Sequence, residues 1–209
     1  MSKKKTLLLI ILIIGIIGAF GGIFWGITLF SYNSAEEPIF ELPIVSEKVL
    51  EVTGIQTFHE EHNGVVHGGF DFKLENDTVI ISPIEGKVTD IHKNQMDNDY
   101  WLVDVNIDIN ARWKMFIAFE PWTQDEGVIE NQLENINVKE GNEVKRGDKL
   151  GTLIPVNGSE FPHIHWNVIE KGFGSDEDVD RSPYDYCSSN AKADLDYLCD
   201  KFDKPASYD

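Results

Sequence analysis

The feature that most constrains the fold of this chain is the alternation of apolar and polar residues along its middle part. Residues 102–109, LVDVNIDI, alternate between the two classes, and Trp113, Met115 and Ile117 continue a second alternation. Side chains on a strand point to opposite faces in turn, so each segment predicts a strand with one buried face. Glycine-containing turn sequences follow at 140–142 and 146–148. From Val52 to Ile169 the pattern therefore predicts short strands throughout.

Helical periodicity of useful length begins only at Ala191 and runs to Phe202, where apolar residues share one face of a short amphipathic helix. Together these patterns favour a mainly β single domain, an antiparallel sheet or barrel-like sandwich, with a short C-terminal helix. We divide the chain into an anchor at 1–30, a linker at 31–50, the β domain at 51–186 and a C-terminal extension at 187–209.

Residues 1–30 predict a transmembrane helix that anchors the chain. Three lysines at 3–5 precede an uncharged run from Thr6 to Phe30, which as a helix at ~1.5 Å per residue would cross a ~30 Å hydrocarbon core. Cleaved signal peptides, the alternative, usually have an apolar stretch of only ~7–15 residues. By the positive-inside rule the N-terminus stays cytoplasmic and the rest lies outside the cell membrane, in an extracellular or periplasmic position.

Charge and cysteine content restrict the partners and the environment. The chain has 18 basic and 36 acidic residues, a net charge of −18. This excess argues against nucleic acid and anionic lipid as ligands, and it fits a solvated acidic surface or a cationic partner. The two cysteines, Cys187 and Cys199, predict a disulfide that closes a short loop in an exported domain, with two buried free thiols as the alternative.

Two histidines lie inside an apolar segment that predicts a strand. In FPHIHWNV, residues 161–168, His163 and His165 share one face of the strand while Ile164, Trp166 and Val168 share the other. A lone histidine in a strand is usually a hydrogen-bonded structural residue. Two adjacent imidazoles on one face, backed by an apolar stripe, indicate a metal or catalytic site as readily as a structural role.

A second short stretch, VVHGGFDF, supplies matching ligand types far upstream. His67 and Asp71 share a face in an extended chain, and Gly68 and Gly69 between them leave room for a metal or a substrate backbone. A nitrogen and an oxygen from here, with one nitrogen from the 163–165 strand, make the three protein ligands that are typical of catalytic zinc sites. Unrelated structural histidines and a surface aspartate remain the alternative.

In this order, the motifs resemble those of the LytM and lysostaphin-type zinc metallopeptidases. HGGFD at 67–71 matches the family's H-x-G-x-D, and PHIH at 162–165 matches its P-H-x-H. SPIEGKV at 82–88, VKEGNEVKRGDKLGTL at 138–153 and SPYDY at 182–186 resemble its intervening and closing segments. The resemblance implies a β-sheet groove with Zn2+ bound by His67, Asp71 and His165. It also implies that His163 stays off the metal and acts as the catalytic group that transfers a proton or stabilises the transition state.

One position departs from the family pattern. The family carries another catalytic histidine in a strand with the pattern Y-x-H-L, and the equivalent stretch here, FIAFE, places Phe119 where that histidine is expected. Phenylalanine cannot transfer a proton or stabilise an oxyanion. His59, His62 or His92 would have to fill the gap from elsewhere, or Glu120 if the strand were shifted by one residue.

The sequence thus predicts an exported, membrane-anchored zinc metallopeptidase that hydrolyses peptide bonds of cell-wall or other extracellular peptides. The alternative is a catalytically weak or inactive zinc-bearing module that binds cell-wall peptides and activates another enzyme. The intact ligands favour the first hypothesis and Phe119 favours the second. A biotinyl- or lipoyl-like carrier is a third interpretation, but Lys114 precedes the glycine-containing hairpin, whereas a carrier lysine sits at a tight turn after it.

Overall fold

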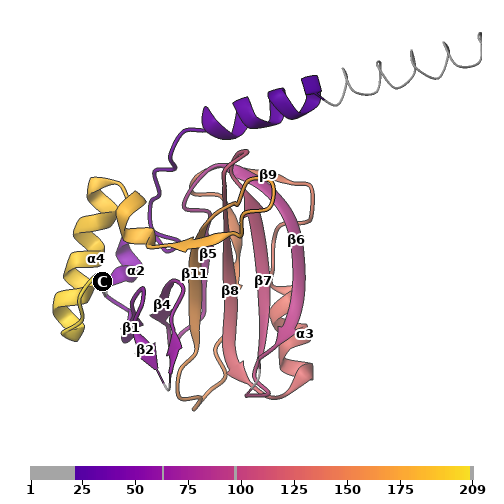
Figure 1. Cartoon of the computed structure of the whole chain (residues 1–209). Helices are drawn as coiled ribbons and strands as arrows, with labels where there is room; N and C mark the ends of the chain where they lie inside the picture. Colours follow the sequence, from indigo (N-terminus) through magenta and orange to yellow (C-terminus); the bar gives the residue numbers. More distant parts are fainter. Residues whose placement is uncertain (1–21, 63, 97, 208–209) are drawn as a thin grey trace, which may run out of the picture.

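The computed structural model describes residues 22–62, 64–96 and 98–207, which form mainly antiparallel strands (Figure 1). The main sheet contains β1 (Gly54–Gln56), β4 (Phe70–Lys73), β6 (Gly86–Gln95), β7 (Trp101–Asp108), β8 (Trp113–Thr123), β9 (Glu143–Val144), β11 (His163–Glu170) and β12 (Val179–Arg181). Its strand order is β1-β4-β11-β8-β7-β6-β9, and β12 also pairs with β11. The predicted mainly β, antiparallel architecture is confirmed.

Two short pairs of strands stand beside the main sheet: β5 (Thr78–Ile81) with β10 (Lys149–Leu153), and β2 (Glu61–His62) with β3 (Val65–Val66). Alternation along β7 and β8 places Val103, Val105 and Phe119 on the core face, where each is fully buried. β10 contacts this face, because a Cβ added to Gly151 would lie 3.1 Å from the ring of Phe119. The opposite face of the main sheet is left for the groove described below.

Helices cover the core and flank the sheet. They are α2 (Ser46–Val49), α3 (Glu126–Glu134), the 3-10 helix η1 (Pro183–Tyr186) and α4 (Ser189–Phe202). The predicted C-terminal helix is confirmed as α4, which begins where the side chain of Ser188 accepts a hydrogen bond from the Ala191 N–H. Helix α3 was not expected. It is capped by Asp125 but buries only Ile129 and Gln132, so its apolar stripe is too short to produce a recognisable period.

The segments on either side of the predicted β domain also contribute to the core. Within 31–50, which was expected to be a linker, Phe40, Leu42 and Ile44 are all at most 4 % exposed. Phe40 donates its N–H to the carbonyl of Tyr186, so the lead-in segment is held to the last residue of η1. The core thus extends beyond the stretch in which the sequence alternates.

The predicted disulfide is wrong, because Cys187 and Cys199 are both free thiols. Each is buried in the apolar core, Cys187 just after η1 and Cys199 on the inner face of α4. Burial raises the pKa of the Cys187 thiol to about 12 and that of Cys199 to about 11. Both therefore stay protonated and pack as small apolar side chains.

The predicted membrane anchor falls largely outside the described residues, since positions 6–21 belong to the part of the chain that the structure does not describe. Between residue 22 and residue 207, leaving aside positions 63 and 97, no helix has the length and hydrophobicity to cross a membrane. Residues 22–33 are helical (Figure 1). The rings of Trp25 and Tyr32 from this helix pack against Phe173, with centroids 5.3 Å and 5.1 Å away.

Candidate metal centre and groove

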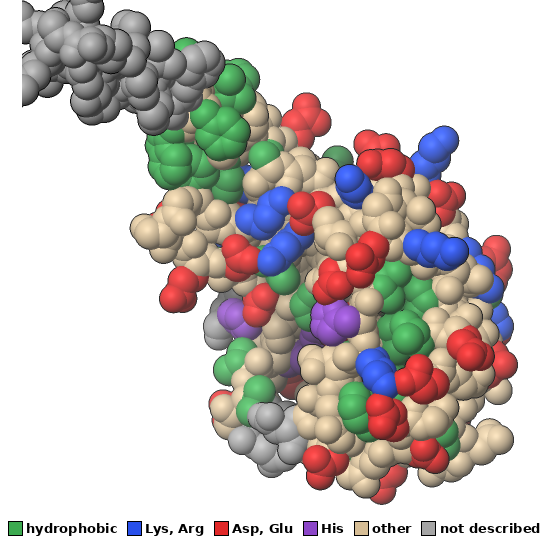
Figure 2. All heavy atoms as spheres, turned by 90° about the vertical axis from the view of Figure 1, so that its right-hand side faces the viewer, with side chains coloured by type: hydrophobic (Ala, Val, Ile, Leu, Met, Phe, Trp, Pro, Cys, Tyr) green, Lys and Arg blue, Asp and Glu red, His purple; other side chains and the backbone are tan. Residues whose placement is uncertain are grey.

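A groove of about 640 Å³ runs across the face of the main sheet that points away from the core. Histidine side chains are visible in its hollow in Figure 2, among acidic side chains. One row of its floor is fixed by strand register, because His92 pairs with Asp104, Asp104 with Ala118, Ala118 with His165, and His165 with Asp71. This row crosses β6, β7, β8, β11 and β4, and its two ends carry different chemistry.

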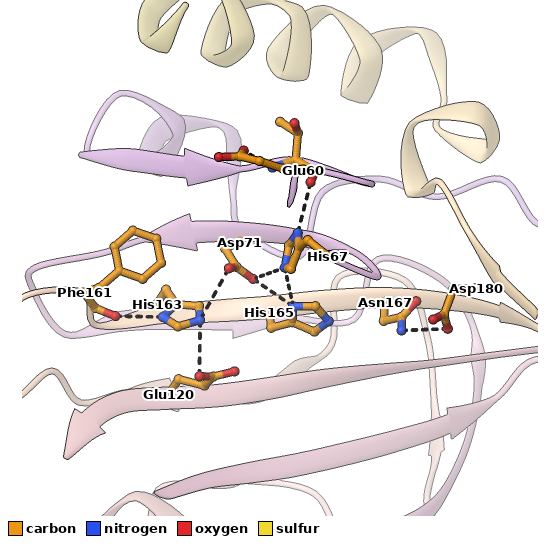
Figure 3. Close-up of polar contacts among 10 residues, drawn as sticks. Glu60, His67, Asp71, Glu120, Phe161, His163, His165, Asn167 and Asp180 are labelled. Atoms are coloured by element: carbon orange, nitrogen blue, oxygen red, sulfur yellow. Dashed lines mark hydrogen bonds and ion pairs between the residues drawn. The ribbon is translucent and has the colours of Figure 1, made fainter. Parts of the chain in front are cut away.

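At the β4–β11 end, three side chains bring one ligand atom each to a common point (Figure 3). His67 Nε2 lies 3.0 Å from Asp71 Oδ1 and 2.9 Å from His165 Nδ1, and the last two atoms are 2.8 Å apart. His67 comes from the loop before β4, Asp71 from β4 and His165 from the neighbouring strand β11. The structure therefore brings together the three residues that the sequence predicts as metal ligands.

The hydrogen bonding of His67 indicates that these atoms suit a cation. Its Nδ1 lies 3.1 Å from the carbonyl oxygen of Thr57. Because a carbonyl only accepts hydrogen bonds, Nδ1 carries the hydrogen in the neutral ring, and Nε2 presents its lone pair to the Asp71 carboxylate. Two acceptors facing each other repel unless a proton or a metal ion lies between them. Two imidazole nitrogens and one carboxylate oxygen form a ligand set that zinc uses.

Close packing around the three donors requires glycine at position 69. A Cβ there would lie 2.3 Å from the carbonyl oxygen of Trp166 and 3.0 Å from the ring of His165. Any larger residue would push β4 away from β11 and separate the ligands. The second glycine of HGGFD is thus explained by the approach of two backbones.

Buried charges set the protonation of the ligands. Burial by itself would raise the pKa of Asp71, but the surrounding imidazoles of His163, His165 and His67 hold it well below its usual range. Burial would lower the pKa of His67, yet the hydrogen bond and charge of Asp71, with the Thr57 carbonyl, raise it. Asp71 is therefore a carboxylate at any physiological pH, as a metal ligand must be.

His163 lies beside the three donors but outside their group. Its Nδ1 is 2.7 Å from the carbonyl oxygen of Phe161, and its Nε2 faces two carboxylates, at 3.3 Å from Glu120 Oε2 and 3.6 Å from Asp71 Oδ2 (Figure 3). Burial would lower the pKa of His163, but these two carboxylates raise it to about 9. The imidazole is then a buried cation whose Nε2–H faces the carboxylates of Glu120 and Asp71.

The expectation that Phe119 occupies the missing histidine's position is wrong. Phe119 is fully buried on the core face of β8, opposite Ile164, whereas Phe116, Ala118 and Glu120 line the groove. The aromatic residue and the histidine of Y-x-H-L must share a strand face, so the position that corresponds to the histidine is Ala118. Ala118 pairs with His165 and carries no polar atom beyond its backbone.

Glu120 is a groove residue that the sequence interpretation left out except under a shift of register. It needs no shift, because it pairs with His163 in β11 and is only 6 % exposed. The information was present in the alternation of Trp113, Met115 and Ile117, which places Phe119 with the core residues and Glu120 with the groove. Among the three histidines considered for the gap, His92 lines the groove, the ring of His59 stacks on Phe58, and the backbone of His62 pairs with Val65.

Aromatic side chains close the end of the groove beside His163. The ring of Trp122 stacks on Tyr100 with centroids 4.5 Å apart and lies 5.7 Å from the ring of His163. Trp122 has a φ of 63°, an uncommon conformation for a bulky residue that fixes the direction of its ring. The ring of Phe161 packs edge-on against the ring of Trp122. These rings give the groove an apolar wall next to its polar floor.

No protein-family model matches the chain, and no curated protein matches it. Solved structures that it resembles include a zinc-containing peptidase from Vibrio cholerae, with 24 % identity over 69 % of this chain and a TM-score of 0.47. Another is the catalytic domain of lysostaphin from Staphylococcus simulans, with 19 % identity, 66 % of this chain, 94 % of that chain and a TM-score of 0.43. A third is the catalytic domain of a prophage-encoded M23 protein from Enterococcus faecalis, with 17 % identity, 62 % and 88 % of the two chains and a TM-score of 0.43.

Two of these structures are named as peptidases, the type of enzyme that the sequence motifs resemble. The chain spans 39 % of the length of the Vibrio cholerae structure.

Proposed function

We propose that the chain is a zinc metallopeptidase that cuts peptide bonds in the groove of its main sheet. The observation that carries this proposal is the convergence of His67 Nε2, Asp71 Oδ1 and His165 Nδ1 within hydrogen-bond distance of one another, next to the buried ring of His163. Three protein donors at one edge of an open groove leave a position for water or substrate.

His67, Asp71 and His165 would hold the zinc ion. When bound, zinc lowers the pKa of a coordinated water and polarises the carbonyl that is attacked. Asp71 also acts through its second oxygen, Oδ2, which faces His163 and helps to keep that ring charged. The metal ligands and the neighbouring cation are thereby coupled through a single carboxylate.

His163 would stabilise the negative charge that develops on the carbonyl oxygen of the substrate. Its ring is oriented by the Phe161 carbonyl and kept protonated by Asp71 and Glu120. A positioned donor of this kind contributes about 10²–10³-fold to the rate in other hydrolases. Glu120 is in this view a positioning residue, since it acts on the substrate only through His163.

The substrate class follows from the shape and surroundings of the groove. A volume of about 640 Å³ with an open side accepts several residues of an extended peptide. We propose that these are cell-wall or other extracellular peptides, reached by a chain whose N-terminal helix is in the membrane. In support, residues 22–30 expose Phe24, Trp25 and Phe30 with no cover from the domain over most of their surface.

A second candidate function is a zinc-bearing module that binds cell-wall peptides and activates another enzyme. Ala118 favours this candidate, because the position beside His165 supplies no second donor to the transition state. The intact ligands and the buried, charged His163 favour the enzyme, since peptide binding alone needs neither.

The deciding experiment measures zinc content and peptide cleavage on the same purified full-length protein in detergent. We expect one zinc per chain and cleavage of cell-wall peptide fragments that a chelator stops and added zinc restores. Zinc binding and peptide binding with no cleavage of any fragment would favour the module. A protein that takes up no zinc would refute both candidates.

A further inference from the structure

The β6–β7 side of the groove carries a histidine held between two carboxylates. His92 Nδ1 lies 2.7 Å from Asp90 Oδ2, and His92 Nε2 lies 3.4 Å from Asp104 Oδ2. Asp90 and His92 are about half exposed, whereas the Asp104 side chain is 13 % exposed. The three groups form a chain that begins in solvent and ends at a nearly buried carboxyl on the groove floor.

Register places this carboxyl on the same row as the candidate metal centre. Asp104 pairs with Ala118, and Ala118 pairs with His165. At a strand spacing of ~4.8 Å, the Cα atoms of Asp104 and His165 are about 10 Å apart, with both side chains on the groove face. Only the methyl group of Ala118 stands between them on this row, so a peptide over Ala118 would contact both.

We propose that Asp104 is a catalytic residue of the groove, which gives its proton to the nitrogen of the peptide bond that breaks, and that His92 and Asp90 resupply that proton from solvent. This inference rests on the proposed peptidase function. It assigns to the β7 strand the proton-transfer role that Ala118 cannot fulfil on β8.

The proton balance of the step is simple. When the carbon–nitrogen bond of the tetrahedral adduct breaks, its electron pair stays on nitrogen, and a new N–H bond forms with the Asp104 proton. Asp104 is left as a carboxylate beside the amine product. It recovers a proton through His92 Nε2, whose ring is reprotonated from water at the exposed end of the chain.

The environment of Asp104 suits a proton donor. Burial raises its pKa to about 6, the negative charges of Glu120 on β8 and Asp90 on β6 add to this, and His92 on β6 and His165 on β11 oppose it. A donor with a pKa near the working pH combines availability of the proton with the tendency to release it. A structural role as a surface ion pair would need no such burial and would contribute little to stability.

The test compares Asp104→Asn with Asp108→Asn on the zinc-loaded full-length protein. Both changes remove one carboxylate from β7, but Asp108 faces Lys171 at 3.3 Å and is about half exposed. We expect Asp104→Asn to lower kcat/KM on the order of 10²-fold at pH 6 with unchanged zinc content, and Asp108→Asn to lower it little. The decline of kcat/KM above about pH 6 should disappear in Asp104→Asn. In His92→Gln it should move to higher pH, because the variant lacks the imidazole whose charge lowers the pKa of Asp104.

A binding measurement gives a readout that does not depend on turnover. After cleavage, the amine product lies against the Asp104 carboxylate, so the protein should bind trialanine more tightly than N-acetyl-trialanine at pH 8. Asp104→Asn should remove this preference, and Asp108→Asn should keep it. Calorimetry on the three proteins measures it directly.

Two outcomes would overturn the inference in distinguishable ways. If Asp104→Asn cleaves peptide at the wild-type rate with the wild-type pH profile, the donor role is refuted while the peptidase function stands. If the wild-type protein cleaves nothing, the proposed function fails. Equal binding of trialanine and its acetylated form would then refute the placement of an amine against Asp104 as well, whereas a preference lost in Asp104→Asn would support it.

Discussion

The two sides of the groove differ in how their chemistry is encoded in the sequence. The ligand side, on β4, β11 and the loop before β4, contains His67, Asp71, His163 and His165, all within two stretches of five residues or fewer. The donor side, on β6, β7 and β8, contains His92, Asp104, Ala118 and Glu120, one or two per strand. Ligands that share one ion must be close together and fall into short patterns. Groups that act across a groove need only share a face and a register row.

The largest effect should come from breaking the ligand side at its centre. Asp71→Asn keeps the shape of the side chain but removes the charge that faces His67, His163 and His165. We expect loss of zinc from the purified protein and loss of peptide cleavage below detection, because two neutral donors hold zinc weakly. Zinc content by mass spectrometry and a cleavage assay measure both.

The matched control is Asp77→Asn, which changes an exposed carboxylate in the turn after β4 and should alter neither zinc content nor cleavage. Zinc retained at full occupancy in Asp71→Asn would show that the metal is held by other residues.

The next effect separates His163 from the ligands beside it. His163→Ala should retain zinc and lose about 10²–10³-fold in kcat, since it removes a positioned donor but no ligand. Glu120→Gln should have a smaller effect in the same direction, because Glu120 only supports the charge of His163. If His163→Ala loses zinc while His165→Ala keeps it, the roles of the two histidines are exchanged.

The position of Phe119 shows which parts of the fold and of the candidate site the sequence could predict. The strand pattern, the C-terminal helix and the three converging ligand residues on the ligand side followed from alternation and two short motifs. The other side of the groove did not, because a match of residue types does not fix which face of β8 a side chain occupies. Extending the alternation from Met115 and Ile117 would have placed Phe119 in the core and Ala118 and Glu120 in the groove.

Other features were beyond the reach of sequence patterns. The contact between His92 and Asp104 depends on the register of β6 against β7, where a bulge between Val88 and Asp90 shifts the pairing. No local property of either strand fixes that shift. The spacing of the two cysteines is compatible with a disulfide, but the burial of each as a free thiol in the apolar core is a tertiary property.

A substitution at Phe119 tests this correction. Phe119→His places a polar ring in the core between β8 and β10, and we expect it to lower the free energy of unfolding by about 3–5 kcal/mol without increasing cleavage. Ala118→His, one residue away, places the ring in the groove and should destabilise the protein less. Denaturant unfolding of both variants measures the difference. A stable Phe119→His protein that cleaves faster than wild type would restore the original alignment.

The smallest effects are on the free energy of unfolding of protein freed of metal with a chelator. Each side of the groove should lower it in a different pH range. His163 has its pKa raised from 6.5 to about 9 by Asp71 and Glu120, so its stabilisation is complete below pH 6.5 and is lost as pH rises through 9. The loss should reach about 3 kcal/mol at most. His163→Gln should abolish this step.

Burial raises the pKa of Asp104 from 3.8 to about 6. The stability that the protonated carboxyl contributes is therefore lost as pH rises from 3.8 through 6, a lower range than that of His163. Partial contact with solvent reduces the expected loss to about 1–2 kcal/mol. Asp104→Asn should remove the lower step and leave the upper one, His163→Gln should do the reverse, and Asp108→Asn should leave both. Denaturant unfolding between pH 5 and pH 10 covers the end of the first range and the whole of the second. If one substitution removed both steps, the two sides would titrate as a single network, and the separation between ligand side and donor side would be wrong.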